Sequence, residues 1–275
     1  MKVAFWSNCK GRAGTTSNMA CMSVICTMLR QTKSILFENH FNLNGLEQAF
    51  VQQRGKSHYL LREELSYYDP TGLEGLMRRV HSNHTYKEMM EDVSLKFLDN
   101  RIYYLPKRSN MNQEYFEFEL NQVIKPLMEC LARLFDFVFV DTAYNNTLST
   151  KSILEGADLV VVNLCQNKIL LDHFFSNYES LVEKSYFLIG CYQEEARYNL
   201  KNIRRRYQIP KNQIGIIPYN LEFSESVNNG TLIQYLMRNF SCSREDENYF
   251  FISQVKEAAQ EILDCLNLEE VSVVS

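Results

Sequence analysis

The chain has 275 residues, which is enough for one large α/β domain or two small ones. Hydrophobic residues make up 45% and charged residues 23% of it, a composition that excludes a disordered chain and a coiled coil. The formal net charge of −4 argues against a protein that coats nucleic acid with its whole surface, although it is compatible with a local basic face.

Short apolar runs alternate along the chain with segments of helical pattern. The predicted strands, in chain order, are Val3–Trp6, Ser34–Phe37, Ile102–Leu105, Phe137–Val140, Leu159–Asn163, Tyr186–Ile189 and Ile214–Ile217. Their runs are continuously apolar, which predicts that helices cover both faces of the sheet. The alternation of strands and helices predicts an α/β fold with a doubly wound, mostly parallel sheet.

The predicted helices are Gly14–Leu29, Asn112–Leu134, Leu170–Val182, Glu194–Tyr207 and about Arg244–Leu266. The first is apolar on most sides and should be buried. The last has Ser243 as a candidate N-cap and an apolar stripe from Phe251 to Leu266. This stripe could bind a membrane or a partner, but we expect it to dock on the core of the chain. Its polar face is acidic, which argues against anionic lipid.

Residues 45–100 are polar and show no clear strand. We predict short helices around Leu60, at Leu73–Val80 and at Tyr86–Glu91, which pack as a cap beside the sheet. The chain is therefore expected to form a single domain over residues 1–275, with a helical insertion at about 45–100 and a C-terminal helix at about 244–266.

The eight cysteines form no C-x-x-C pair, and no histidines stand near them at zinc spacing. Several lie in apolar runs, where a free thiol packs as a small hydrophobe. We therefore expect buried thiols in a reducing cytoplasm. The chain has no apolar stretch long enough to span a bilayer, and its N-terminus lacks the apolar core of a signal peptide. We expect a cytoplasmic protein with no integral membrane segment.

A strand, a tight turn and a helix follow one another at the N-terminus, which is the context that a phosphate-binding loop needs. Gly11 and Gly14 let backbone N–H groups approach phosphate oxygens, and the helix N-terminus adds the positive end of its dipole. The hydroxyl of Thr16 is placed to ligate Mg²⁺. The usual G-x-x-x-x-G-K-[ST] pattern is not met, because Thr15 holds the lysine position. The bare pattern is also typical of a purely structural turn.

Four segments, in the correct order, resemble the MinD/ParA family of P-loop ATPases, including its pilus-associated TadZ/CpaE relatives. Lys10–Thr16 matches the family's loop, roughly K-G-G-x-G-K-T-T, at all but two positions. Phe135–Thr142 resembles the family's Walker B strand. Gly156–Val162 resembles the next strand and its entry. Ile214–Asn220, followed by Ser226 and Gly230, resembles the segment that lines the base pocket.

The resemblance implies a P-loop NTPase fold, ATP and Mg²⁺ as ligands, and a homodimer. It places Lys10 on the signature lysine that reaches the partner's nucleotide across the dimer, and Asp141 beside Mg²⁺ together with Thr16. The residues it assigns to nucleotide binding are Lys10, Gly11, Arg12, Ala13, Gly14, Thr15, Thr16, Ser17, Pro218 and Tyr219. The candidate catalytic residues are Lys10, Asp141 and His40.

Three of the departures from the family bear on its chemistry. Thr15 replaces the lysine that neutralises the β- and γ-phosphates, and His40 stands where the family's switch segment has an aspartate that orients the attacking water. His40 either holds a water or is only a loop histidine. Gly190 lies where relatives often place a side chain that reads the adenine. Because the charge stabilisation of phosphoryl transfer is then incomplete, we predict weak or absent hydrolysis.

The main cation left is Lys10 supplied by a second protomer, so we hypothesise that ATP binding depends on dimerisation. The leading interpretation is a pseudo-ATPase scaffold for positioning or assembly, with a protein cargo such as a Tad-type pilus or secretion complex. Such a partner could recruit it to the membrane or the cell pole. One alternative is an active ATPase in which Lys10, Arg12 and Thr15 reconstitute the site.

A second alternative is a DNA-partitioning protein that uses a basic cluster. The cluster comprises Lys201, Arg204, Arg205, Arg206 and Lys211. DNA is the less favoured partner, because Glu194 and Glu195 begin the same predicted helix and the chain is acidic overall.

Overall fold

The computed structural model describes residues 1–40, 45–52, 72–81, 90, 93–107 and 112–273, and within them eight strands form one sheet. The strands are β1 (Lys2–Trp6), β2 (Ser34–Glu38), β3 (Leu95–Phe97), β4 (Ile102–Tyr104), β5 (Phe137–Asp141), β6 (Leu159–Leu164), β7 (Ser185–Tyr192) and β8 (Ile214–Pro218). Their order across the sheet is β3-β4-β2-β5-β1-β6-β7-β8. Only the β3–β4 pair is antiparallel.

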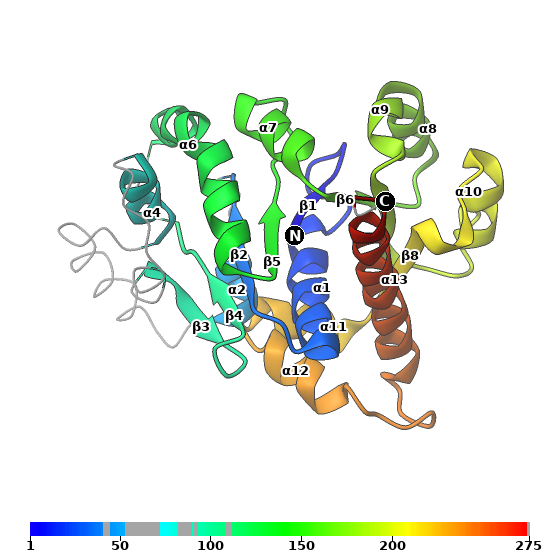
Figure 1. Ribbon diagram of the computed structural model, residues 1–275. Helices are drawn as coiled ribbons and strands as arrows, with labels where there is room; N and C mark the ends of the chain where they lie inside the picture. Colours follow the sequence, from blue (N-terminus) through cyan, green and yellow to red (C-terminus); the bar gives the residue numbers. More distant parts are fainter. Residues whose placement is uncertain (41–44, 53–71, 82–89, 91–92, 108–111, 274–275) are drawn as a thin grey trace.

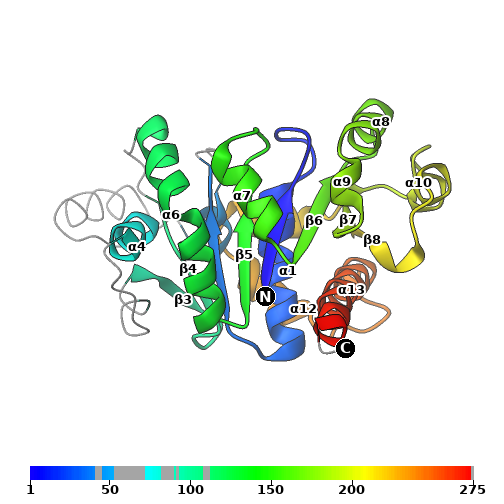
Figure 2. The ribbon, with the colours of Figure 1, turned by 45° about the horizontal axis from the view of Figure 1, so that its top comes forward.

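Two layers of helices enclose this sheet (Figures 1 and 2). One face is covered by α1 (Thr15–Arg30), α2 (Leu46–Phe50), α11 (Leu221–Asn228), α12 (Leu232–Asn239) and α13 (Tyr249–Val273). The other face is covered by α4 (Gly72–His81), α6 (Gln113–Leu134), α7 (Leu148–Gly156), α8 (Lys168–Asn177), α9 (Glu179–Val182) and α10 (Leu200–Tyr207). A short 3-10 helix, η1 (Lys211–Gln213), precedes β8.

The burial of the strands explains why helices cover both faces. Every residue of β2, β5 and β6 is buried, so neither face of the sheet centre can be left in water. Along β1, Val3 and Phe5 join the core under α1, whereas Ala4 and Trp6 join the core on the opposite face. The predicted doubly wound, mostly parallel sheet is confirmed, and its strand positions agree with the apolar runs.

Helix boundaries differ from the sequence pattern at three places. The predicted helix Leu170–Val182 is two helices, separated at Tyr178, whose ring packs against Trp6 at a centroid distance of 4.9 Å. The helix predicted from Glu194 begins only at Leu200, because the side chain of Asn199 caps it by accepting from the Asn202 amide. The two glutamates before it therefore do not belong to this helix.

The C-terminal helix begins at Tyr249 and not near Arg244, so the prediction of Ser243 as its N-cap is wrong. The carboxylate of Asp246 accepts the amide of Asn248 at 2.8 Å, a local turn that competes with helix formation. The apolar stripe of α13, from Phe251 to Leu266, lies in the core beside α1 and β8, as expected.

The described parts of the insertion lie on both faces of the sheet and not in one cap, and the prediction that the insertion lacks a strand is wrong. Its β3 pairs antiparallel with β4 at the sheet edge, through a turn in which Leu98, Asp99 and Asn100 have positive φ. Three residues are too few for an alternating pattern to stand out. In the described part, α2 covers one face of the sheet and α4 packs on α6 across the other. The helix predicted around Leu60 and most of that at Tyr86–Glu91 lie outside the described residues.

No described helix combines the length and apolar character that a bilayer crossing would require.

Candidate functional site

The turn between β1 and α1 lies at the carboxyl edge of the sheet, and two glycines shape it. Gly11 has φ 68° and Gly14, which precedes the first residue of α1, has φ 65°. Both values lie in the left-handed region, where a side chain would be strained. Lys10, Gly11 and Arg12 are exposed, whereas Ala13 is buried. The turn therefore exposes its backbone and two cationic side chains to solvent, whereas Ala13 is packed inside the protein.

Two buried amides hold this turn on the sheet. The Asn18 side chain donates to the Ala13 carbonyl and to Asn163 Oδ1, both at 2.9 Å. Asn163, in turn, donates to the carbonyls of Val161 and Trp6 at 3.1 and 3.4 Å. Sequence reasoning missed this pair, although each is an isolated amide in an apolar run. Since an unmade buried hydrogen bond costs about 1–3 kcal/mol, the pair fixes the loop strongly.

Gly190 of β7 passes directly beneath the turn. A Cβ at this position would lie 2.3 Å from the Ala13 carbonyl oxygen and 2.7 Å from Asn18 Nδ2. The resemblance to the MinD/ParA family placed residue 190 beside the adenine. In the structure, its backbone packs against the loop. Cys191, the next residue, lines the neighbouring pocket. Glycine is therefore required at 190 by the close approach of strand and loop.

A pocket of about 240 Å³ lies beside the first turn of α1. Gly14 and Ser17 line it on one side, and Pro218 and Tyr219, at the end of β8, line it on the other. Pro218 is buried, whereas the Tyr219 ring is largely exposed. The structure thus brings together two segments, some 200 residues apart in the chain, that the sequence assigned to one nucleotide site.

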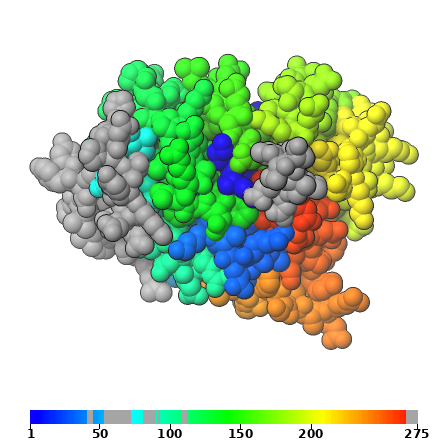
Figure 3. Space-filling view, viewed as in Figure 1, coloured from blue at the N-terminus to red at the C-terminus, as the bar shows by residue number. Residues whose placement is uncertain are grey.

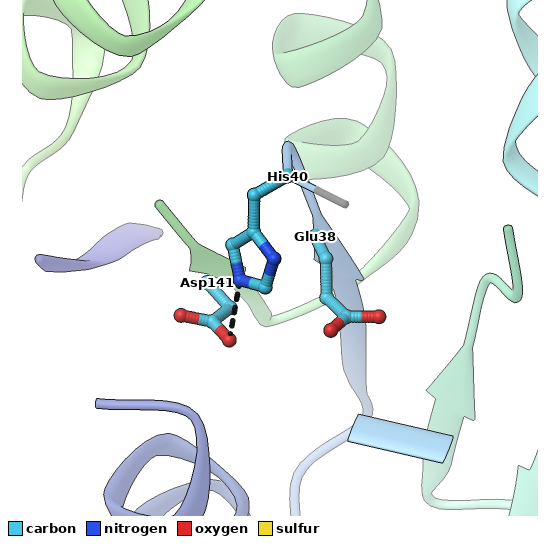
Figure 4. A group of neighbouring side chains, drawn as sticks. All are labelled: Glu38, His40 and Asp141. Atoms are coloured by element: carbon cyan, nitrogen blue, oxygen red, sulfur yellow. Dashed lines mark ion pairs between the residues drawn. The ribbon is translucent and has the colours of Figure 1, made fainter. Parts of the chain in front are cut away.

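Asp141, at the end of β5, is the centre of a buried polar cluster. Its Oδ2 accepts the hydroxyl of Thr16 at 2.5 Å and lies 2.9 Å from Nε2 of His40. The side chains of Asp141 and His40 are 1% and 7% exposed. Figure 4 shows the imidazole of His40 between the carboxylates of Asp141 and Glu38. His40 therefore belongs to the buried cluster around Asp141.

Glu38 ends β2 opposite Asp141 in the strand register, and structural contacts occupy its carboxylate. It accepts the Leu46 amide at 3.1 Å and the Tyr104 hydroxyl at 2.9 Å, and the ammonium of Lys107 lies 3.5 Å away. Lys107 also donates to the His40 carbonyl. Glu38 thereby fixes the backbone that carries His40.

Asn39 ties the segment after β2 to the segment after β5. Its backbone N–H donates to the Asp141 carbonyl at 3.2 Å, and its side-chain oxygen accepts the Ala143 amide at 2.5 Å. Its amide group donates to Thr150 at 3.3 Å. Because both segments are held in one network, a change at Asp141 would reach both of them.

One side-chain atom each from Glu38, His40 and Asp141 lies within 4.8 Å of the others, which is close enough for a shared cation. Mg²⁺ prefers oxygen ligands in octahedral geometry and keeps several waters. The hydroxyl of Thr16 and the carboxylate of Asp141 fit that preference, whereas the imidazole of His40 does not. Thr16 and Asp141 are therefore the residues that fit Mg²⁺. Binding of the ion would displace His40 from Oδ2 of Asp141.

The exposed cation Lys10 leans over the ring of Tyr144, with its Nζ 5.6 Å from the centroid. Tyr144 follows β5, and about half of its side chain is exposed. Position 15, where a P-loop lysine would lie, carries the hydroxyl of Thr15. Lys10 therefore lies on the solvent side of the loop, where it can meet another molecule.

Arg204, Arg205 and Arg206 lie on α10, which forms an outer edge of the molecule, drawn yellow in Figure 3. Arg206 donates to the carboxylate of Asp172 at 3.0 Å. Hydrogen bonds from Lys168, Tyr207 and Arg206 lower the pKa of Asp172. Arg206 thus has a structural partner, which supports packing of α10 on α8.

All eight cysteines are free, and only Cys21 and Cys26 are fully buried. Burial raises the pKa of the Cys26 thiol to about 12. Cys191 is exposed and the other five are partly so, which corrects the expectation of buried thiols. Short apolar runs also border loops, so an apolar neighbourhood in sequence did not guarantee burial.

Neither a comparison with protein-family models nor one with curated proteins gives a match. Solved structures do match over nearly the whole chain. A ParA family ATPase from Chlorobium tepidum has TM-score 0.69 and 11% identity, covering 94% of this chain and 98% of its own. MinD of Pyrococcus horikoshii, complexed with Mg-ADP, has TM-score 0.66 and 13% identity, covering 95% and 96%.

The cell division ATPase MinD of Pyrococcus furiosus has TM-score 0.64 and 16% identity, covering 96% of this chain and 98% of its own. These likenesses show that the chain has the P-loop NTPase fold. Within that fold class, the chain has the fold of the MinD/ParA ATPases.

Proposed function

We propose that this protein binds Mg·ATP at the β1–α1 loop, hydrolyses it weakly or not at all, and acts as a dimeric scaffold that positions or assembles a protein cargo. The observation that carries the proposal is the hydrogen bond between the Thr16 hydroxyl and the Asp141 carboxylate at the carboxyl edge of the sheet. Loop amides and the pocket beside Pro218 adjoin it. Phosphates, a metal and a base would each meet suitable groups there.

Binding is expected to be weak in a single protomer. The N-terminus of α1 and the loop amides offer partial positive charges to phosphate. Thr15 adds none, and Lys10 and Arg12 are exposed. A cation supplied across a dimer would make up the deficit. The candidate binding residues are therefore Lys10, Gly11, Arg12, Ala13, Gly14, Thr15, Thr16, Ser17, Pro218 and Tyr219.

Hydrolysis needs a group that orients the attacking water and charges that stabilise the transition state. The two buried carboxylates at this edge are engaged: Asp141 with Thr16 and His40, and Glu38 with Tyr104 and Lys107. A neutral imidazole at His40 can hold a water but cannot supply the charge of an aspartate. The engaged carboxylates and the uncharged His40 therefore favour slow or absent turnover. They count against the alternative of an active ATPase with a reconstituted site.

A second copy of the chain is the expected partner at this face. The carboxyl edge carries exposed apolar side chains: 48% of Tyr144, 67% of Leu148 and 76% of Ile169 are accessible. They follow β5 and β6, the strands on either side of β1. Together with exposed Lys10, they form a surface suited to a face-to-face homodimer that encloses nucleotide.

The cargo is a protein complex, of which a Tad-type pilus or secretion assembly is one kind, and it would bring the cytoplasmic scaffold to the membrane or pole. DNA is the less favoured partner, because Arg206 of the basic cluster is paired with Asp172 and the chain is acidic overall.

Replacement of Lys10 by alanine tests the dimer. Wild-type protein with Mg·ATP is expected to sediment as a dimer, and Lys10→Ala as a monomer, because the variant lacks the cation that each protomer would supply to its partner's phosphates. Analytical ultracentrifugation with and without Mg·ATP measures this directly.

Lys33→Ala is the matched control, since Lys33 is exposed at the opposite, amino edge of the sheet. It should dimerise like the wild type. An ATP-dependent dimer that survives Lys10→Ala, or equally tight ATP binding by a protein that stays monomeric, would contradict the proposal.

A further inference from the structure

Two thiols meet at the base of the phosphate-loop turn. β1 and β6 are parallel neighbours with Trp6 opposite Val162, and Cys9 and Cys165 each follow three residues later. Their side chains are hydrogen-bonded to each other, and both are partly exposed. Adjacent paired strands lie about 4.8 Å apart, so the two chain segments leave β1 and β6 at a separation that a disulfide can span.

The surroundings of the pair favour a thiolate on Cys9. The hydrogen bond from Cys165 lowers the pKa of Cys9, burial opposes this, and Ser7 and Arg12 lower it further, to about 6. The Ser7 hydroxyl lies 3.3 Å from the sulfur. The same sulfur–sulfur contact raises the pKa of Cys165. At neutral pH the shared proton therefore stays on Cys165, and Cys9 is the nucleophile.

We propose that Cys9 and Cys165 form an oxidation site, at which a hydroperoxide converts the two neighbouring thiols into a disulfide that ties the phosphate loop to the end of β6. The Cys9 thiolate attacks one peroxide oxygen, the O–O bond breaks, and after protonation water or an alcohol leaves, giving the sulfenic acid. The sulfur of Cys165 then displaces this hydroxyl as water. Two thiols are oxidised and one peroxide is reduced.

The disulfide would act on the loop because Cys9 starts the turn that carries Lys10 to Gly14. Phosphate binding requires several N–H groups of this turn to aim at the same oxygens. A covalent tie at Cys9 restricts that adjustment, and it also replaces the contact of the Cys9 sulfur with the Ser7 hydroxyl. We expect about a tenfold loss of ATP affinity. This consequence rests on the proposed function, whereas formation of the disulfide does not.

Peptide mapping tests the disulfide independently of nucleotide. Reduced full-length protein is treated with hydrogen peroxide, alkylated and digested with trypsin without reductant. The expected product joins residues 3–10 to residues 152–168, each of which contains one cysteine. Cys9→Ser and Cys165→Ser should abolish it. Cys130→Ser, which alters another partly exposed thiol on α6, should leave it unchanged.

The pH dependence of alkylation tests the thiolate. Because the thiolate reacts, iodoacetamide labelling of Cys9 should rise with a midpoint near pH 6. In Cys165→Ser the midpoint should move upward. A wild-type midpoint near that of an ordinary thiol, or absence of the linked peptide, would overturn the inference. If the disulfide forms but the reduced protein binds no ATP, the oxidation site stands and the proposed function fails.

Discussion

Thr15→Lys is expected to tighten Mg·ATP binding about tenfold to a hundredfold, which corresponds to about 1.4–2.7 kcal/mol. An ammonium at the start of α1 would reach the β- and γ-phosphates and add a charge-assisted hydrogen bond, which is worth about 1.5–3 kcal/mol. Thr15 is only partly buried, so a longer side chain has room to extend toward the ligand. Titration calorimetry with Mg·ATP measures the change.

Thr15→Met is the matched control, because it has comparable length without the charge. It should bind ATP no more tightly than the wild type. A gain shared by both variants would show that packing, and not the missing ammonium, limits affinity. Thr15→Lys alone is not expected to restore turnover, because a neutral imidazole at His40 still cannot supply the charge of an aspartate to the attacking water.

Gly190→Ala is expected to destabilise the protein by about 1–3 kcal/mol, the usual cost of overpacking a core. The new methyl group would lie 2.3 Å from the Ala13 carbonyl oxygen. Since backbone atoms cannot move as a flexible side chain can, the loop must shift and strain the Asn18–Asn163 pair. Urea unfolding measures the loss of stability, and ATP affinity should fall with it.

Gly156→Ala separates this steric effect from the general effect of adding a methyl group. At Gly156, the last residue of α7, a Cβ would meet no atom within 4 Å. Alanine there should be neutral or slightly stabilising, because it restricts the unfolded chain. Equal losses in the two variants would contradict the claim that β7 supports the loop through close contact.

The sequence predicted the central architecture because that architecture depends on local signals. Continuous apolar runs fixed which strands are buried on both faces, and Asp141 follows such a run, so its place at the carboxyl edge was predictable. The strand–turn–helix pattern with Gly11 and Gly14 likewise placed Thr16 at the start of α1.

Other parts of the site could not be predicted, because they depend on contacts between distant residues. The Asn18–Asn163 pair and the approach of Gly190 to Ala13 join segments that no short motif links. His40 was placed by alignment with a switch aspartate, but its contact with Asp141 follows from the Asn39 and Glu38 networks. The start of α10 was missed because the side chain of Asn199 decides it.

ATP binding without turnover is tested by measuring nucleotide binding and phosphate release in the same sample of reduced protein. We predict saturable binding that requires Mg²⁺, that is lost in Asp141→Ala, and that occurs without phosphate release above a protein-free control. No saturation up to millimolar ATP, or repeated turnover that Asp141→Ala abolishes, would contradict this prediction.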